Sequence, residues 1–423
     1  MRNLISCACV LAPVFAAVTL AGCRDDDDGG GGATPIDAGA EGDAALGCLE
    51  ITGDVRADAV WTKLPSEADA GDTPDVCVRR DVTVQRGAVL TISPGVRVVF
   101  DPGTSLVVAR AEGAALVAEG TESEPIVLEG SSAEPGTWDG VEINSRDPRN
   151  RVAFATIRGA GGGGEVVADD TLGGLAAALV LDAEPGAPAT ADVHHVTFED
   201  SAGWGLVVEG ISEARGLTDN RFVGNRLGAV VLSPHNVALM DASTTYEGNA
   251  FDGVAVTGTP NLEAATATTW KRLAEGAKYW VRAPVRVLSD LTIEAGAELV
   301  FAAGTGLEFP QNAANTRAQV VIVGTADAKV SFTGEQPVAG FWDGIEIQTG
   351  HVTNRVHHAI VAHAKSGIRV RRAGSFPAAT LDVADSHLHD NEVCGVESTS
   401  AQNTLTVTNV TYERNGTDHC PPP

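Results

Sequence analysis

Apolar residues in this chain occur in short runs that are interrupted by glycine, proline and polar turn residues. The run Leu90–Ile92 is followed by a Pro-Gly turn and by a second apolar run at Val98–Phe100. Apolar positions do not recur at the spacing that places them on one face of a helix. The pattern therefore predicts an all-β chain made of short strands.

The same block of sequence occurs twice, at Leu90–Ile143 and at Leu291–Ile347. Each copy opens with Leu-Thr-Ile, passes through a strand that ends in Phe, and closes with Trp-Asp-Gly, an aliphatic residue and Glu-Ile. Trp138 and Trp342 lie 342 − 138 = 204 residues apart at matched positions, which favours packing at a turn as the role of both. Repetition on this scale predicts a duplicated module.

A shorter period lies within the modules. Phe198, Phe222 and Tyr246 are spaced by 222 − 198 = 24 and 246 − 222 = 24 residues, and an asparagine follows each of the last two after three positions. A period in the low twenties with Asn at a repeated turn is typical of one coil of a parallel β-helix. Successive coils would lie ~4.8 Å apart, so equivalent side chains would stack. Asn at this turn can tolerate a left-handed φ and can hydrogen-bond to its stacked neighbour.

These motifs resemble those of the right-handed β-helix proteins of the pectate-lyase-like superfamily, and in particular its bacterial secreted and lipoprotein members. The resemblance covers about residues 50–420 and rests on Leu90–Val96, Phe100, Gly120-Thr121, Pro125-Ile126, Trp138, Gly140-Val141 and Asn150–Val152. It implies the fold. It does not imply an activity, because this fold carries lyases, hydrolases, adhesins and proteins without known chemistry.

The N-terminus resembles a bacterial lipoprotein signal. Arg2 precedes an apolar stretch at residues 4–20, and Leu-Ala-Gly then leads to Cys23, as in a lipobox. The resemblance implies a signal peptide over residues 1–22 and lipidation of Cys23, which would anchor the protein to a membrane leaflet without spanning it. Arg24 stands where an inner-membrane retention signal carries Asp, so the outer membrane is the expected location.

The remaining chain divides by composition and by the repeat. Residues 23–47 are rich in Asp, Gly and Ala, which predicts a disordered acidic tether. Residues 48–260 then form β-helix module 1 and residues 261–423 form module 2. One continuous stack is expected, because no flexible linker separates the modules. The predicted fold class is thus all-β, a right-handed parallel β-helix (solenoid) with a duplicated module.

Four cysteines remain outside the signal peptide and the lipidation site. Cys48 and Cys77 lie at one end of the folded region, and Cys394 and Cys420 lie at the other. A disulfide between the two cysteines at each end is the simplest of the three possible connectivities. Export of the protein favours disulfides over free thiols.

The charge limits the choice of partners. The net charge of −27 disfavours nucleic acid, and it disfavours an acidic polysaccharide unless cations intervene. A polysaccharide or an envelope protein is the expected ligand, with no cofactor predicted and calcium left open. Trp204, which has no partner in module 2, is a candidate for stacking on a sugar ring, although core packing is favoured.

Catalytic and metal-binding motifs are weak. Asp169-Asp170 occurs without the Gly-His-Gly and Arg-x-Lys blocks of the galacturonase pattern, so no catalytic residue is assigned. His387 and His389 are two apart on a predicted strand and share one face, to which His363 is a possible neighbour. Solvated histidines are favoured there over a metal site, and no metal ligand is assigned.

The expected function is a non-enzymatic binding or structural role at the cell envelope, with a glycan or a protein as ligand. The alternative is a polysaccharide lyase or a glycoside hydrolase. A carboxylate pair with a nearby Lys or Arg in one groove would favour the enzyme. Scattered charges without a converging cluster would favour the binding protein.

Overall fold

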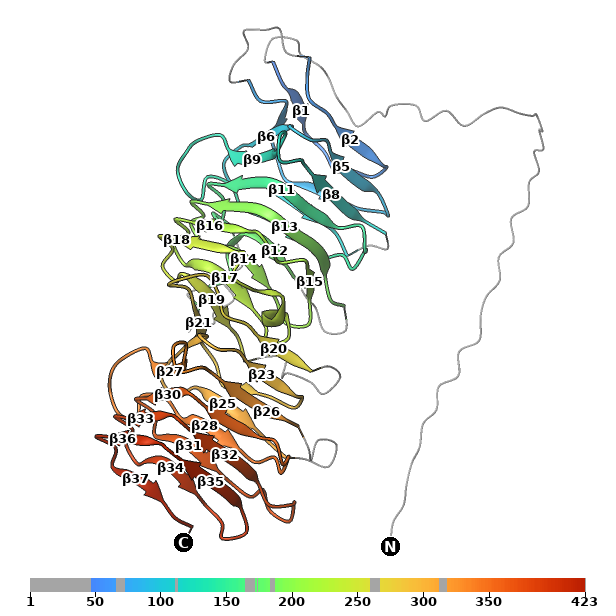
Figure 1. Ribbon diagram of the computed structural model, residues 1–423. Coiled ribbons are helices and arrows are strands. Elements are labelled where there is room, and N and C mark those ends of the chain that lie inside the picture. The colour runs from blue at the N-terminus through green and yellow to red at the C-terminus, as the bar shows by residue number, and fades with distance from the viewer. Residues whose placement is uncertain are drawn as a thin grey trace, which may run out of the picture. The chain divides into compact units, whose positions relative to one another are not determined.

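The strands of this chain coil into a parallel β-helix, as Figure 1 shows for the computed structural model. The structure describes residues 47–65, 73–110, 113–163, 172, 174–182, 187–258, 267–311 and 318–422. Within the compact unit Ala38–Pro423, every strand ladder that the structure records is parallel, as in β11 with β13 and in β28 with β31. The all-β fold is confirmed, and the parallel stacking is that expected for a right-handed β-helix.

In module 1, the first and second strands of each coil belong to one sheet. Their bounds are β1 (Leu49–Ile51), β2 (Ala59–Trp61), β3 (Val76–Val78), β5 (Val89–Ile92), β6 (Arg97–Phe100), β8 (Ala115–Glu119), β9 (Ile126–Gly130), β11 (Arg151–Arg158), β13 (Thr190–Glu199), β15 (Glu213–Arg215), β16 (Arg221–Val223) and β18 (Thr245–Glu247).

A second sheet begins with the third strands of module 1 and continues into module 2. Its strands are β4 (Val82–Val84), β7 (Ser105–Val108), β10 (Gly140–Ile143), β12 (Ala177–Leu181), β14 (Trp204–Val208), β17 (Gly228–Leu232), β19 (Gly253–Val256), β21 (Lys278–Val281), β24 (Glu298–Phe301), β27 (Val330–Gly334), β30 (Ala359–Ala362), β33 (His387–His389) and β36 (Thr411–Glu413).

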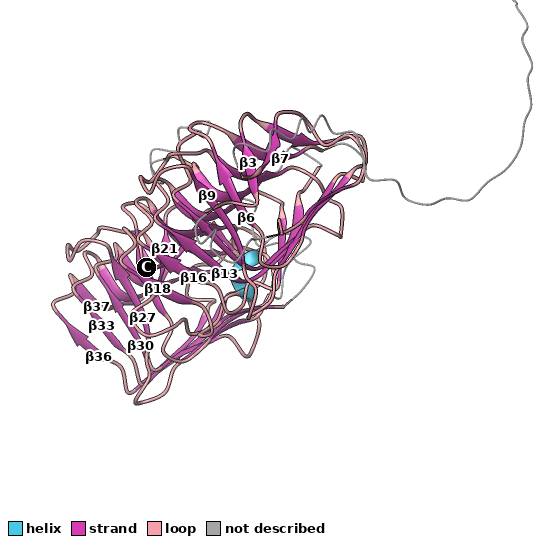
Figure 2. Ribbon diagram, turned by 90° about the horizontal axis from the view of Figure 1, so that it is seen from above, coloured by secondary structure: helices cyan, strands magenta, loops and turns pink. Residues whose placement is uncertain are grey.

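Module 2 adds two further sheets to each coil. The first strands are β20 (Thr268–Trp270), β23 (Leu291–Ile293), β26 (Val320–Val323), β29 (Arg355–His357), β32 (Thr380–Ala384) and β35 (Thr404–Thr408). The third strands are β22 (Val285–Arg286), β25 (Gly306–Phe309), β28 (Gly344–Ile347), β31 (Ser366–Val370), β34 (Cys394–Ser398) and β37 (Thr417–Cys420). Figure 2 shows the strands of the β-helix in stacked layers, with the short 3₁₀ helix η1 (Asn236–Leu239) in cyan.

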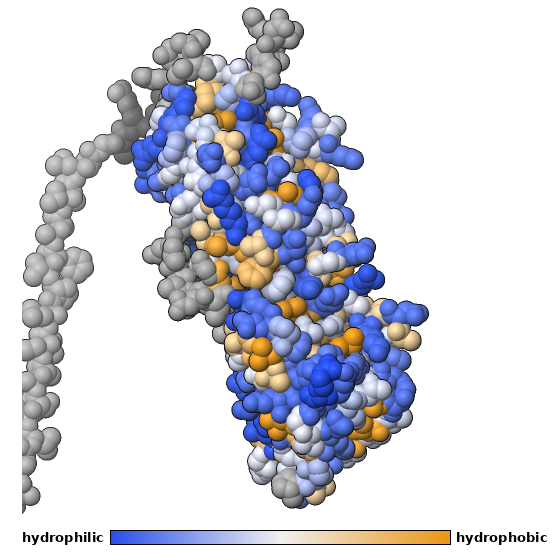
Figure 3. Space-filling model, turned by 90° about the vertical axis from the view of Figure 1, so that its left-hand side faces the viewer, coloured by the Kyte–Doolittle hydropathy of each residue, from blue (hydrophilic) through white to orange (hydrophobic). Residues whose placement is uncertain are grey.

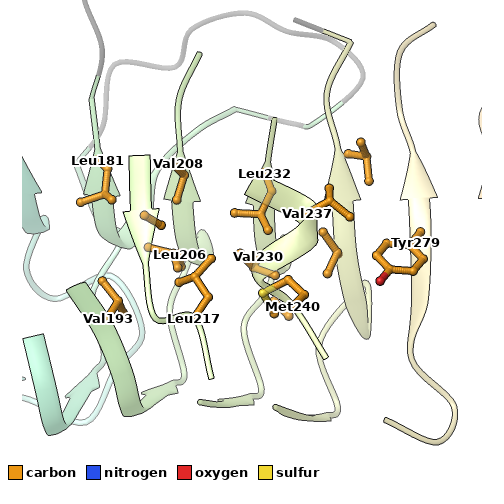
Figure 4. Close-up of a cluster of buried hydrophobic side chains, with 14 of the residues drawn as sticks. Leu181, Val193, Leu206, Val208, Leu217, Val230, Leu232, Val237, Met240 and Tyr279 are labelled. Carbon is orange, nitrogen blue, oxygen red and sulfur yellow. The ribbon is translucent and has the colours of Figure 1, made fainter. Parts of the chain in front are cut away.

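The interior is filled by aligned apolar side chains, because alternate residues of each strand point inward. Leu181, Val208 and Leu232 occupy equivalent positions of β12, β14 and β17, are almost fully buried, and point into the same core (Figure 4). The rings of Phe198 and Phe222 stack with centroids 4.9 Å apart, as the 24-residue period predicts. The apolar alternation therefore builds one long core.

Asparagines tie neighbouring coils together at the turns. The Asn225 side chain donates to Phe198 O and to Asn249 Oδ1, and its own Oδ1 accepts from Ser201 N. The expected hydrogen bond between stacked asparagines is thus present, and Asn225 makes it without a left-handed φ. The residue before it takes that conformation, as at Gly224 (φ 65°). A residue with ordinary φ can aim its amide along the stack while its predecessor makes the turn.

The strands of the two modules pair directly. β19 is the third strand of its coil, yet it pairs with β21, the second strand of the next coil. The sheet of third strands in module 1 therefore continues as the sheet of second strands in module 2. The expected boundary at residues 260 and 261 falls outside the described residues, as do residues 1–46 with Cys23 and nearly all of the predicted tether.

Disulfides join the terminal coils to their neighbours. Cys48 is bonded to Cys77 beside the β1–β3 ladder, and Cys394 is bonded to Cys420 where β34 pairs with β37. These are the two pairings that the sequence favours. In the described part of the chain, no helix has the length and apolar character needed to cross a membrane.

Candidate functional site

Four carboxylates converge on the outer face of the third-strand sheet of module 1. Asp139 precedes β10, Glu142 lies within it, Asp182 follows β12, and Glu209 follows β14. They line a hollow of about 420 Å³ together with apolar residues such as Val180. We call these four residues and their hollow the acidic pocket.

Strand alternation explains why these side chains face outward. Val141 and Ile143 point into the core and are buried, so Glu142 between them points to the surface. Leu181 and Val208 are likewise buried, so the residues that follow them, Asp182 and Glu209, turn outward. Parallel pairing of β10, β12 and β14 then brings together residues that are far apart in the sequence.

Burial and mutual repulsion perturb the acidic pocket. Burial raises the pKa of Glu209 from 4.5 to about 7, and the adjacent Asp182 and Glu142 carboxylates contribute. Burial, with the charge of Asp81, also raises the pKa of Asp139. Interaction with the Asp182 side chain adds to the rise in the pKa of Glu209 and favours its protonated form.

Neutralisation of the pocket by basic groups is weak. Arg110 lies 3.9 Å from Asp182, and its side chain remains substantially exposed. Asn144 Nδ2 donates to Glu142 Oε1 at 2.6 Å, which supplies a hydrogen bond but no charge. The pocket therefore keeps a strong negative potential.

The duplication supplies an internal comparison. A hollow of about 400 Å³ lies in module 2 at Asp343 and Glu346, which occupy the positions of Asp139 and Glu142 shifted by 204 residues. We call it the counterpart pocket. There Arg371 donates to Glu346 at 2.7 Å, and Arg369 lies 3.7 Å from the same carboxylate.

Strand register shows what replaces those arginines in module 1. Glu346 pairs with Arg369 across the β28–β31 ladder, whereas Glu142 pairs with Val180 across the β10–β12 ladder. Arg371 directly follows β31, and Asp182 directly follows β12. In module 1, Val180 occupies the position of Arg369, and Asp182 occupies the position of Arg371. The two pockets therefore have the same backbone arrangement but different charges.

An outer apolar cluster lies beside the acidic pocket. Trp204 is fully buried against Val207 and Val231, and its indole Nε1 donates to Gly174 O at 3.0 Å. Its ring is therefore inaccessible for stacking on a sugar, and core packing, which the sequence favours, is observed. The surface on the side shown in Figure 3 is largely hydrophilic, with scattered apolar areas.

The histidines form a separate group in module 2. His387 and His389 flank the buried Leu388 and point outward, with ring centroids 4.6 Å apart, and His363 lies 6.1 Å from His389. His389 Nδ1 lies 2.7 Å from Asp390 Oδ2. In the described ranges, no group of three or more His, Cys, Asp or Glu residues is arranged to hold a metal ion.

The sequence motifs did not identify the acidic pocket. The conserved spacing of the Trp-Asp-Gly block drew attention to Trp138 and Trp342, which are indeed buried, and not to the acids beside them. The difference between Val180 and Arg369 would have been the signal, but it is visible only once the strand register is known. Asp169 and Asp170 lie outside the described residues.

Comparison with known proteins agrees with the geometry of the coils. No curated protein matches the chain. Residues 75–178 match the family model of the pectate-lyase like beta helix domain, a range that includes Asp139 and Glu142 of the acidic pocket. This part of the chain is therefore similar to a pectate-lyase-like β-helix domain, and the coils that follow it extend the same parallel stack.

Proposed function

We propose that the protein is a non-enzymatic binding β-helix of the cell envelope, lipid-anchored through Cys23 to the outer membrane, and that the acidic pocket holds its ligand. The observation that carries the proposal is the difference between the two pockets. Glu346 is neutralised by Arg371 and Arg369, whereas in module 1 the same positions leave Glu142 without an arginine. Carboxylates that cluster at a surface repel one another and disfavour folding, so a role in ligand binding would account for them.

The chemistry of the pocket favours a glycan that carries amino groups. Its volume of about 420 Å³ lies in the range of small-molecule sites and would accommodate one or two sugar residues. Carboxylates accept hydrogen bonds from hydroxyl groups and form charge-assisted bonds to an ammonium group. Val180 and Leu175 offer apolar contacts for the carbon skeleton of a sugar ring. A polyanionic glycan would be repelled.

A glycoside hydrolase is the second candidate, and specific observations favour it. Asp182 and Glu209 line one hollow, Arg110 lies 3.9 Å from Asp182, and the Glu209 pKa of about 7 suits a general acid. The two carboxyl groups of a hydrolase must, however, stand about 5 to 9 Å apart to flank the glycosidic bond. The interaction through which Asp182 raises the pKa of Glu209 acts only at short range, which favours a closer spacing of these two carboxyl groups, and we therefore place binding first.

Binding is tested by calorimetry on the full chain carrying Cys23→Ser, which prevents acylation. Amino-sugar, neutral and acidic oligosaccharides are compared. The Asp182→Asn variant is expected to lose about tenfold or more in affinity for amino-sugar ligands, because a charge-assisted hydrogen bond contributes about 1.5–3 kcal/mol. The Asp139→Asn variant is expected to weaken binding, whereas Asp343→Asn at the matched position of the counterpart pocket should leave it unchanged. Equal loss from both of these variants, or binding of acidic glycans alone, would contradict the proposal.

Catalysis is tested with the same glycans, with and without calcium. Release of reducing ends would indicate a hydrolase, and absorbance from unsaturated products would indicate a lyase. Turnover that Glu209→Gln abolishes would replace the binding role with the enzymatic one. Binding without turnover is the expected result.

The anchor is tested in cells by metabolic labelling with palmitate. The wild-type chain is expected to incorporate label and to fractionate with the outer membrane, whereas Cys23→Ser should do neither. Label that persists in Cys23→Ser would exclude this residue as the acylation site. Recovery of the wild-type protein in the inner membrane would exclude the proposed location.

A further inference from the structure

Among the described residues, the sheet that contains β35 ends at this strand. β35 is the terminal strand of the sheet that runs from β20 through β32, so one of its edges has no neighbouring strand in the described chain. Such an edge presents backbone N–H and C=O groups to any strand that can pair with them.

The apolar side chains of this coil are incompletely covered. Leu405 and Val407 of β35 stack on Leu381 and Val383 of β32. Leu381 and Val383 are almost fully buried, whereas the two residues of the last coil are only half-buried against the core. Tyr412 of β36 is likewise half-buried, although its equivalent Leu388 is fully buried. The core therefore continues to the end of the stack and lacks one layer of contacts.

The sequence of this edge carries none of the features that prevent strand pairing. β35 is Thr-Leu-Thr-Val-Thr, five residues with strong β propensity and neither Pro nor charge. The whole segment 398–412 is uncharged, although 20% of the chain is Asp, Glu, Lys or Arg. At the opposite end of the stack, β1 has only three residues and contains Glu50, which pairs with Arg79 at 3.1 Å. Among the described strands, β35 is thus the longer of the two terminal strands and the one without charge.

The last coil is firmly held, so this edge is well ordered. Cys420 in β37 is bonded to Cys394 in the preceding coil. Asn415 donates to Leu388 O at 2.9 Å, and Asn391 donates to Asn415 Oδ1 at 2.8 Å. A rigid edge loses little conformational entropy when a strand is added to it.

We propose that this edge pairs with the same edge of a second copy of the chain, so that two β-helices join end to end about a two-fold axis. Identical strands related by such an axis pair antiparallel, and the strand is then its own complement. Two molecules that each carry a net charge of −27 repel one another, and an uncharged segment provides a place for close approach. Pairing would cover Leu405 and Val407 and would bring Thr side chains of the two strands together, which is a favourable cross-strand contact.

The test is sedimentation velocity on the full chain with Cys23→Ser, so that acylation cannot drive association. The wild-type sequence is expected to pass from a monomer of 43.4 kDa to a dimer as its concentration rises through the micromolar range. Because salt screens the repulsion between the two anionic molecules, dimerisation should tighten several-fold between about 0.02 and 0.5 M NaCl.

Variants at the edge separate this contact from general effects of charge. Thr406 is the exposed central residue of β35, so Thr406→Lys would oppose two ammonium groups at the axis and should abolish the dimer. Thr406→Val should retain it. Thr292→Lys makes the same charge change in β23 of the same sheet, away from the end, and should also retain it. Each lysine substitution lowers the net negative charge of the protein. If association depended only on overall charge repulsion, both variants would therefore associate more strongly than the wild type.

Three results would overturn the proposal. One is a monomer at all accessible concentrations and salt conditions. Another is a dimer that Thr406→Lys and Thr292→Lys affect equally. The third is growth beyond the dimer, which would indicate an open head-to-tail contact and not a closed two-fold one.

Discussion

Replacing Glu209 with glutamine is expected to stabilise the protein at pH 8.5 and to have little effect near pH 4.5. The pKa of Glu209 is raised from 4.5 to about 7 by burial and by the neighbouring carboxylates. The folded state therefore holds this proton where the unfolded chain has released it. Because the folded state binds more protons between pH 4.5 and 7, the free energy of unfolding of the wild type falls as pH rises through that window.

The magnitude follows from the same two pKa values. At about 1.36 kcal/mol per pKa unit, the rise from 4.5 to about 7 sets an upper bound of about 3.4 kcal/mol. Glu209 keeps contact with solvent, so screening reduces the expected gain to about 1–2 kcal/mol. Glutamine has the shape of the protonated acid and can still donate a hydrogen bond to Asp182.

The assay is urea unfolding at pH 4.5, 7 and 8.5, followed by tryptophan fluorescence. The wild-type midpoint should fall over this range relative to that of Glu209→Gln. Glu122→Gln is the control, because Glu122 is fully exposed at a turn and its replacement changes the net charge by the same amount. The reasoning is refuted if wild type and Glu209→Gln show the same pH dependence, or if Glu122→Gln stabilises the protein equally.

Three further predictions concern the duplicated site, the asparagine stack and the terminal coil. Glu142→Gln should stabilise the protein by up to about 1 kcal/mol through relief of repulsion, whereas Glu346→Gln should destabilise it by about 1–3 kcal/mol by leaving Arg partners unneutralised. Urea unfolding at pH 8 should therefore show a higher midpoint for Glu142→Gln and a lower one for Glu346→Gln. A shift of both midpoints in the same direction would contradict the comparison of the pockets. Asn225→Ala should lower the free energy of unfolding by about 2–4 kcal/mol, because several buried hydrogen bonds are lost together, and hydrogen exchange should then accelerate in the adjoining coils but not at the C-terminus. The double variant Cys394→Ser with Cys420→Ser should lose roughly 3 kcal/mol and expose the last coil to protease first, and unchanged cleavage there would show that the disulfide does not hold the coil.

Local sequence was sufficient for the strands and for the stacking period. Alternation in segments such as Val98–Phe100 predicts which side chains point inward, and Val98 and Phe100 are buried. The 24-residue spacing of Phe198 and Phe222 predicts that equivalent side chains stack, and these two rings are buried and stacked. These features depend on near neighbours and on one repeated period. The turn geometry was harder, because Gly224 and not Asn225 takes the left-handed conformation, a choice that hydrogen bonding between coils decides.

The join between the modules also depended on tertiary structure. The 204-residue repeat shows that Trp138 and Trp342 are equivalent, but not how the coils are turned relative to one another. In the stack, β19 pairs with β21, so equivalent strands of the two modules lie in different sheets. A repeat spacing specifies which residues are alike, whereas the path of the connecting chain determines the sheet in which each strand pairs.

By itself, the sequence determined an all-β stacked fold and a duplicated module, because both follow from local pattern or order along the chain, and it favoured the pairing of cysteines at each end among three connectivities. Only the tertiary structure brought Glu142, Asp182 and Glu209 together and showed that arginines neutralise the same site in module 2. These acids come from different coils, and their register depends on turns of variable length. Convergence of charge is a property of the stack, and no single stretch of sequence encodes it.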